Sequence, residues 1–140
     1  MKILHILLIL VACVSCSVEQ TTYSTKAFND EYRQALFISK LKKSNISFEI
    51  DNSDFVIIKF KDKTKFMKLY MESQELGNST KSVLPENICH INELSKYLIE
   101  LDIVHIKSSE NDTFKVTVSS HDFEQNNIMG QFVKAKIACE

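Results

Sequence analysis

The chain has 140 residues, a net charge of −1, 44% hydrophobic residues and 25% charged residues. This is the composition of an ordinary globular protein, and the small net charge provides no general attraction to nucleic acid or anionic lipid. Only two glycines and one proline are present, which argues against a loop-rich scaffold.

Residues 1–15 have the pattern of a secretory signal. Lys2 gives a positive start, an apolar run from Ile3 to Val11 follows, and small residues come after it. The run is shorter than the roughly 18 apolar residues that indicate a membrane span. We therefore predict that residues 1–15 are a signal peptide that is removed. The remaining chain, about 125 residues, would work outside the cytoplasm and is large enough for one domain with a core.

The end of this leader contains the segment Leu10-Val11-Ala12-Cys13, which resembles the lipobox of bacterial lipoproteins. The resemblance implies that the thiol of Cys13 receives a diacylglyceryl group and that the signal is cut just before it. The protein would then be anchored on the periplasmic face of a bacterial membrane. A second match, Cys13-Val14-Ser15-Cys16, would place the lipid on Cys16 instead.

Ordinary secretion is the alternative to a lipid anchor. Ser15-Cys16-Ser17 also fits a small-x-small cleavage site, which would start a free, extracellular chain at Val18. Glycosylation acceptors occur at Asn45, Asn78 and Asn111, and they would matter only in a eukaryotic secretory route.

The first half of the folded region predicts a helix, a hairpin and a helix. Residues 16–25 are polar and without periodicity, which predicts a flexible tether, and a single domain would follow over 26–140, with subunits at 26–75 and 88–139. Helical spacing of apolar residues predicts a helix over 28–43. Alternation predicts strands at 46–50 and 55–60 around a turn at 51–54, and a helix follows Asp62.

A connector is predicted over residues 76–88, and the second half repeats the order. Ile91, Leu94, Leu98 and Leu101 step by three and four residues, which predicts a helix face. We expect strands at 103–106 and 114–119 around a turn at 108–112, and a last helix over 121–138.

The predicted order is αββα, connector, αββα, and the predicted class is α+β. Because one hairpin with two helices is marginally stable alone, we expect the hairpins to join into one four-stranded antiparallel sheet covered by helices. Residues 41–46 parallel residues 98–103, and Phe66 and Phe123 share the same offset of 57. An internal duplication is therefore one hypothesis.

Two cysteines, Cys89 and Cys139, lie in the body of the chain. In an oxidising compartment such a pair usually forms a disulfide, and free buried thiols are the alternative. The two residues lie at the start and the end of predicted helices, so antiparallel packing of these helices would bring the cysteines together.

The body has no Gly-rich phosphate loop, nucleophile elbow, HExxH or CxxC motif. Cys89 and His90 are sequence neighbours, and such residues do not face each other on a helix. We therefore predict no catalytic residue, no metal site, no cofactor and no nucleic-acid partner. A cleft lined by His105 or His121 together with an acid would instead favour a hydrolase.

The expected function is protein–protein binding in the envelope. Small lipid-anchored periplasmic proteins that neutralise a toxin or hydrolase are similar in size and cellular location. This likeness is an analogy and does not rest on a shared sequence motif. The alternative is a freely secreted binding protein or effector. We expect contacts through the loops at 51–54, 76–88 and 108–112, since loops carry function most often.

Overall fold

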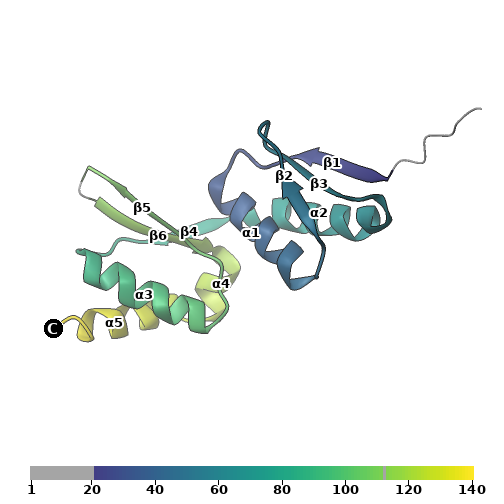
Figure 1. The fold of residues 1–140 in the computed structure, drawn as a ribbon. Helices are drawn as coiled ribbons and strands as arrows, with labels where there is room; N and C mark the ends of the chain where they lie inside the picture. The colour runs from purple at the N-terminus through teal and green to yellow at the C-terminus, as the bar shows by residue number, and fades with distance from the viewer. Residues whose placement is uncertain (1–20, 112) are drawn as a thin grey trace, which may run out of the picture.

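The computed structural model describes residues 21–111 and 113–140. The first half contains β1 (Thr22–Lys26), α1 (Glu31–Lys43), β2 (Phe48–Ile50), β3 (Phe55–Lys59), the 3-10 turn η1 (Phe60–Asp62) and α2 (Lys63–Gly77). The second contains β4 (Thr80–Val83), α3 (Ile88–Glu100), β5 (Ile106–Glu110), β6 (Thr113–Ser119), α4 (Ser120–Gln125) and α5 (Ile128–Ile137). The two halves lie side by side, with β1 and the carboxyl terminus at opposite ends (Figure 1).

The fold is mixed α and β, with two three-stranded antiparallel sheets in the orders β1-β3-β2 and β4-β6-β5. The predicted single four-stranded sheet is therefore wrong. Each hairpin pairs with a third strand of its own half: β1 comes from the predicted tether, and β4 from the predicted connector. Residues 16–20 of that tether lie outside the described residues.

These two strands escaped prediction because they carry little hydrophobic signal. β1 reads TYSTK, and in β4, which reads TKSV, Val83 is the one buried residue. Edge strands need only one face against the core and take half of their hydrogen bonds from a neighbour. The position of β1 and β4 is therefore fixed by their pairing with β3 and β6, and the periodicity of their own residues does not fix it.

The second hairpin is displaced from its predicted position. β5 begins at Ile106 and continues through Glu110, so the expected strand at 103–106 and turn at 108–112 are placed too early. Ile103 is instead buried just after α3. Ser108 to Glu110 form an exposed edge of the sheet, where polar residues are tolerated.

The predicted last helix over 121–138 is broken into α4 and α5. The break is at Asn127, which has φ 48° and caps α5 through a hydrogen bond from the Gly130 N–H to its side chain. Among the described residues, five non-glycine residues have left-handed φ values, and all are Asn or Asp: Asn45, Asp54, Asp102, Asn111 and Asn127. These types tolerate that region best after glycine, which explains how a chain with two glycines makes tight turns.

The halves share their order of elements and strands, but a duplication of the sequence is not supported. If the offset of 57 is applied to the first strand of each hairpin, Glu49 of β2 corresponds to Ile106 of β5. Their partners Ile57 and Thr117 differ by 60. The constant offset is therefore lost at the hairpin turn, and the likeness between the halves is one of topology.

Most of the buried hydrophobic residues of the described chain form two separate clusters, one in each half, whereas buried Tyr32 and Leu36 belong to neither. The first contains Phe37, Leu41, Ile46, Val56, Ile58 and Phe66. The second contains Val83, Ile91, Leu94, Leu98, Ile103, Val116, Val118, Ile128, Phe132 and Ala135. Of the predicted helix face in α3, Ile91, Leu94 and Leu98 are buried, whereas Leu101 is exposed after the helix ends.

The first testable prediction concerns Gly77 at the end of α2. A Cβ atom there would lie 2.2 Å from Cγ of Arg33, and Arg33 is held by a 2.9 Å hydrogen bond from its Nη2 to Oδ1 of Asn78. Because the clash is with the base of the arginine side chain, Gly77→Ala should destabilise the protein by about 1–3 kcal/mol. Urea denaturation measures this.

The matched control is Met71→Ala in the same helix. Met71 is exposed, so this substitution should change the unfolding free energy by less than about 0.5 kcal/mol. Equal stability of Gly77→Ala and the parent protein would contradict the contact with Arg33.

Candidate functional site

The predicted lipid-attachment residues Cys13 and Cys16 lie outside the described residues. The predicted disulfide is present: the sulfur atoms of Cys89 and Cys139 are 2.11 Å apart and their Cα atoms 6.0 Å apart. It joins the first turn of α3 to the end of α5, and these two helices pack against each other. The antiparallel arrangement expected from the sequence therefore brings the cysteines together.

The three histidines of the body do not form one site. His90 is buried against Phe132, and its Nδ1 has no hydrogen-bond partner in the part of the chain that the structure describes. His105 lies in the loop after α3, and His121 is an exposed residue in the first turn of α4. The described residues contain no group of three or more His, Cys, Asp or Glu side chains that could hold a metal ion.

Sequence reasoning missed a contact between Ser95 and His105. The Ser95 Oγ lies 2.5 Å from His105 Nε2, and His105 Nδ1 lies 3.1 Å from the carbonyl oxygen of Ile103. If Nδ1 carries the proton, Nε2 accepts from the serine, which is the arrangement of a nucleophile and its base. Ser95 is 4% exposed, however, so a substrate has no access and the pair satisfies buried polar groups.

The most distinctive site lies where the two halves meet. The backbone N–H of Ser119 donates to the Tyr32 hydroxyl at 2.7 Å, and this bond is buried. Nearby, the backbone N–H of Ser120 donates to the Ser79 carbonyl at 2.9 Å. These bonds fix the start of α4 against α1 and against the segment that joins the two halves.

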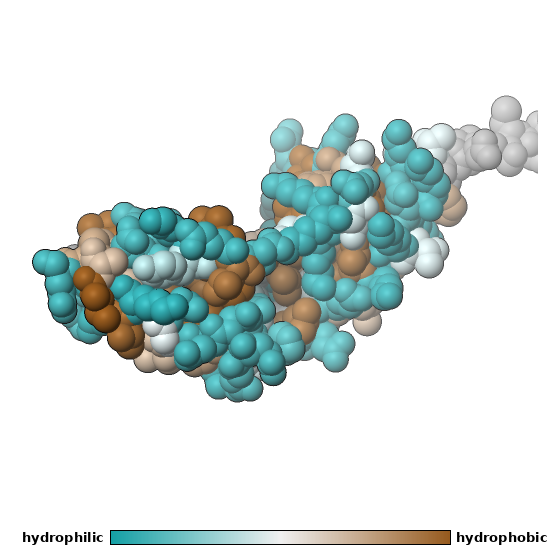
Figure 2. Space-filling model, turned by 90° about the horizontal axis from the view of Figure 1, so that it is seen from below, coloured by the Kyte–Doolittle hydropathy of each residue, from teal (hydrophilic) through white to brown (hydrophobic). Residues whose placement is uncertain are grey.

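A cleft of about 250 Å³ opens beside this junction, and we call it the junction cleft. Its walls come from both halves: Leu36, Ser39, Lys40 and Lys43 of α1, Leu76 of α2, and Asp102, Val104, Ser119, His121 and Asp122 of the second half. The α1 residues recur every three or four positions and so share one helix face. The two halves meet at a narrow waist, where hydrophobic surface (brown) is visible in Figure 2.

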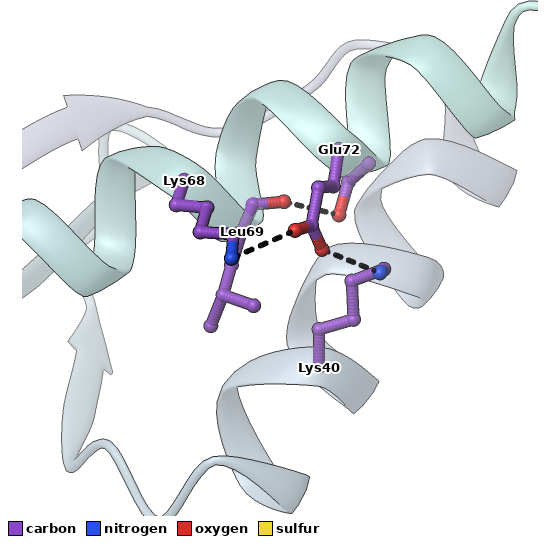
Figure 3. A network of polar contacts seen from close by, with 5 residues as sticks. Lys40, Lys68, Leu69 and Glu72 are labelled. Carbon is purple, nitrogen blue, oxygen red and sulfur yellow. Dashed lines mark hydrogen bonds and ion pairs between the residues drawn. The ribbon is translucent and has the colours of Figure 1, made fainter.

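The two lysines of the junction cleft are both paired with acids. Lys40 Nζ lies 3.0 Å from Glu72 Oε2 across α1 and α2, and Lys68 approaches the other oxygen of Glu72 at 4.0 Å (Figure 3). The hydrogen bond and charge of Lys40 lower the pKa of Glu72. Lys43 Nζ lies 2.5 Å from Asp102 Oδ2. The positive charge on this wall is therefore largely compensated.

Asp122 differs from the other acids of the junction cleft. Its Oδ2 accepts a 2.7 Å hydrogen bond from Ser119 Oγ, which in turn accepts from the Asp122 backbone N–H at 2.9 Å. Within residues 21–111 and 113–140, no lysine, arginine or histidine forms an ion pair with Asp122. The carboxylate is therefore held in place by a neutral group in the first turn of α4 and has no ion-pair partner among the described residues.

The junction cleft contains a histidine and acids, which is the arrangement that would favour a hydrolase. No hydrogen bond orients His121 on an acid or hydroxyl in the described part of the chain, and the Ser119 hydroxyl is buried and bound to Asp122. An activated nucleophile requires a base aligned on it. The described residues of the junction cleft therefore show no nucleophile aligned with a base.

The Tyr32 hydroxyl gives the second testable prediction. Tyr32→Phe removes the acceptor of the buried Ser119 N–H, which should cost about 1–3 kcal/mol of unfolding free energy. Tyr97→Phe is the control, because the Tyr97 hydroxyl has no side-chain hydrogen bond among the described residues. A Tyr32→Phe protein that melts with the parent would show that the junction does not depend on this bond.

The same residue gives the junction a pH dependence. Burial, more than any other cause, raises the pKa of Tyr32 above its ordinary value of 10.0. As pH rises past 10.0, the unfolded chain loses this proton before the folded chain does, so the contribution of Tyr32 to stability falls. Below that pH the contribution is fully present, and Tyr32→Phe should remove the alkaline loss due to this group.

The three predicted contact loops have different structures. Residues 51–54 form the expected hairpin turn, in which Asp51 Oδ1 accepts from the backbone N–H groups of Ser53 and Phe55. Residues 76–88 contain β4, and residues 108–110 belong to β5. The first of these two segments is therefore interrupted by a short strand, and most of the second belongs to a strand.

An exposed hydrophobic stripe lies on α5 and was not singled out from the sequence. Met129, Val133 and Ile137 are four residues apart and exposed, so they follow one face of the helix. Brown patches lie on the surface of the same half in Figure 2. Exposed apolar groups of this kind mark contact surfaces when they are contiguous.

In residues 21–111 and 113–140, no helix is long and apolar enough to cross a membrane. No protein-family model, curated protein or solved structure matches the chain.

Proposed function

We propose that this chain is an exported protein of a bacterial envelope, held to the membrane by a lipid on Cys13 or Cys16, and that it acts by binding another protein. The observation that carries export is the Cys89–Cys139 disulfide. Both cysteines are at least partly exposed, and such a bond persists in an oxidising compartment and is rare in the cytosol.

The shape of the molecule is compatible with an anchor at its amino-terminal end. β1 lies at the opposite end from the carboxyl terminus (Figure 1). A lipid on Cys13 would therefore leave the junction cleft and the second half available to a partner. Exposed hydrophobic side chains and a mixed polar cleft are features of protein-binding surfaces, so an inhibitor or immunity-type neutraliser of a toxin or hydrolase fits this arrangement.

Mass spectrometry of the processed amino terminus tests the anchor. We expect a diacylglyceryl group on Cys13, loss of that group in a Cys13→Ala variant, and release of the variant from the membrane fraction. A Cys16→Ala variant is the matched control and should remain anchored. If Cys16→Ala loses the lipid and Cys13→Ala keeps it, the alternative attachment site is correct. An unmodified Val18 start would overturn the anchor.

Free secretion with glycosylation is the second candidate, and one observation favours it. Asn45, Asn78 and Asn111 are all exposed, so an oligosaccharide could be attached to each without entering a core. In this case we expect the protein to start at Val18 and to lose mass on treatment with an N-glycosidase. Unchanged mass after this treatment would remove the candidate.

A further inference from the structure

The charges around the junction cleft are unequal once its ion pairs are counted. Lys40 is compensated by Glu72 and Lys43 by Asp102. Asp122 remains, fixed by the neutral Ser119 hydroxyl and paired with no cation among the described residues. A fixed carboxylate that lacks a counter-charge favours a cation, and a partly enclosed position strengthens the attraction because less water screens it.

The rest of the junction cleft suits an aliphatic stem. Leu36, Leu76 and Val104 line it together with the polar residues. Lysine and arginine side chains bury their methylene stems on apolar surface while the charged head meets a polar group. The cleft volume of about 250 Å³ is below the roughly 300–1,000 Å³ of most small-molecule sites, so it fits one side chain better than a cofactor.

We infer that the junction cleft receives one lysine or arginine side chain of a protein partner, with its stem on Leu36, Leu76 and Val104 and its charged head on Asp122. This inference rests on the proposed protein-binding function and names the anchor that the partner provides. Since an arginine can donate two parallel hydrogen bonds to a carboxylate, arginine is expected to bind more tightly than lysine.

The test uses short probes that imitate the partner side chain. The probes are n-butylguanidinium, n-butylammonium and butyrate, titrated separately into the protein while amide shifts are followed by ¹H–¹⁵N NMR. We expect saturable shifts at Leu76, Val104 and Asp122 with millimolar dissociation constants, in the order guanidinium before ammonium. Butyrate should produce no saturable shift at these residues.

Variants of Asp122 separate charge from structure. Asp122→Asn keeps an acceptor for Ser119 and should weaken butylguanidinium binding about tenfold, equivalent to about 1.4 kcal/mol. Asp122→Glu should retain most of the binding. Glu124→Gln is the matched control, because Glu124 lies on the same short helix and pairs with Lys81 at 2.8 Å, away from the cleft.

Three results would overturn the inference: butyrate binding as well as butylguanidinium, no saturable binding of either cation, or unchanged binding in a folded Asp122→Asn protein. If Asp122→Asn fails to fold, weaker binding at raised salt in the parent protein would support it, and salt-independent binding would overturn it. Failure of the lipid anchor is distinguishable, because a chain without lipid that still binds butylguanidinium removes the envelope proposal alone.

Discussion

Phe37→Ala is expected to lower the free energy of unfolding by about 3–5 kcal/mol. Phe37 is fully buried, and its ring lies 5.7 Å from Phe28, 5.2 Å from Phe66 and 5.4 Å from Tyr70, in edge-to-face geometry with all three. Truncation would therefore remove three aromatic contacts and leave a cavity at the centre of the first core. Urea denaturation followed by circular dichroism measures the loss.

The control for this prediction is Phe60→Ala. Phe60 is an exposed aromatic residue of the same half, and its loss should cost less than about 1 kcal/mol. Because the two cores share no buried residue, hydrogen exchange in Phe37→Ala should accelerate mainly in the first half. Uniform acceleration in both halves would contradict the separation of the two cores.

Loss of the disulfide is expected to cost about 4 kcal/mol in the chain-entropy model. Cys89 and Cys139 are separated by 50 residues, so the bond closes a large loop and restricts the unfolded chain. It also fastens the end of α5 to α3 in the second half, which provides one of the walls of the junction cleft. The measurement compares the unfolding free energy of the parent with that of the double variant that carries both Cys89→Ala and Cys139→Ala.

The comparison is made in a background that carries Cys13→Ala and Cys16→Ala, so that the two distal cysteines are the only thiols. Reduction of this parent should reproduce the instability of the double variant, because both remove the same constraint. If both thiols of the folded, air-oxidised parent react with an alkylating agent and the variants are equally stable, the bond and the argument for export fail together.

The patterned elements of the fold were predictable from the sequence because their signals are local. In α3, Ile91, Leu94 and Leu98 recur at helical spacing and are all buried. The hairpin turn at 51–54 followed from its Asp and Asn content, since these side chains bond to nearby backbone N–H groups. The disulfide followed from the count of cysteines in the body of the chain and the expected compartment.

Other features of the fold depend on contacts between segments that are distant in the sequence, and these features were decided only by the tertiary structure. β1 and β4 are strands because β3 and β6 offer unpaired backbone groups to them, and their own residues do not alternate clearly. That requirement divides the strands into two sheets and replaces the expected single sheet.

The junction cleft has the same origin. Lys40 and Asp122 have no relation in the sequence, and they share a cleft because the Tyr32–Ser119 bond sets one half against the other. The sequence alone determined most of the helical segments, the tight turn at 51–54 and the two cysteines that pair, whereas it missed the break at Asn127 and misplaced the second hairpin turn. The pairing of strands and the meeting of the two halves were decided only in three dimensions, because hydrogen-bond satisfaction and burial act between segments and leave no periodic signal within one.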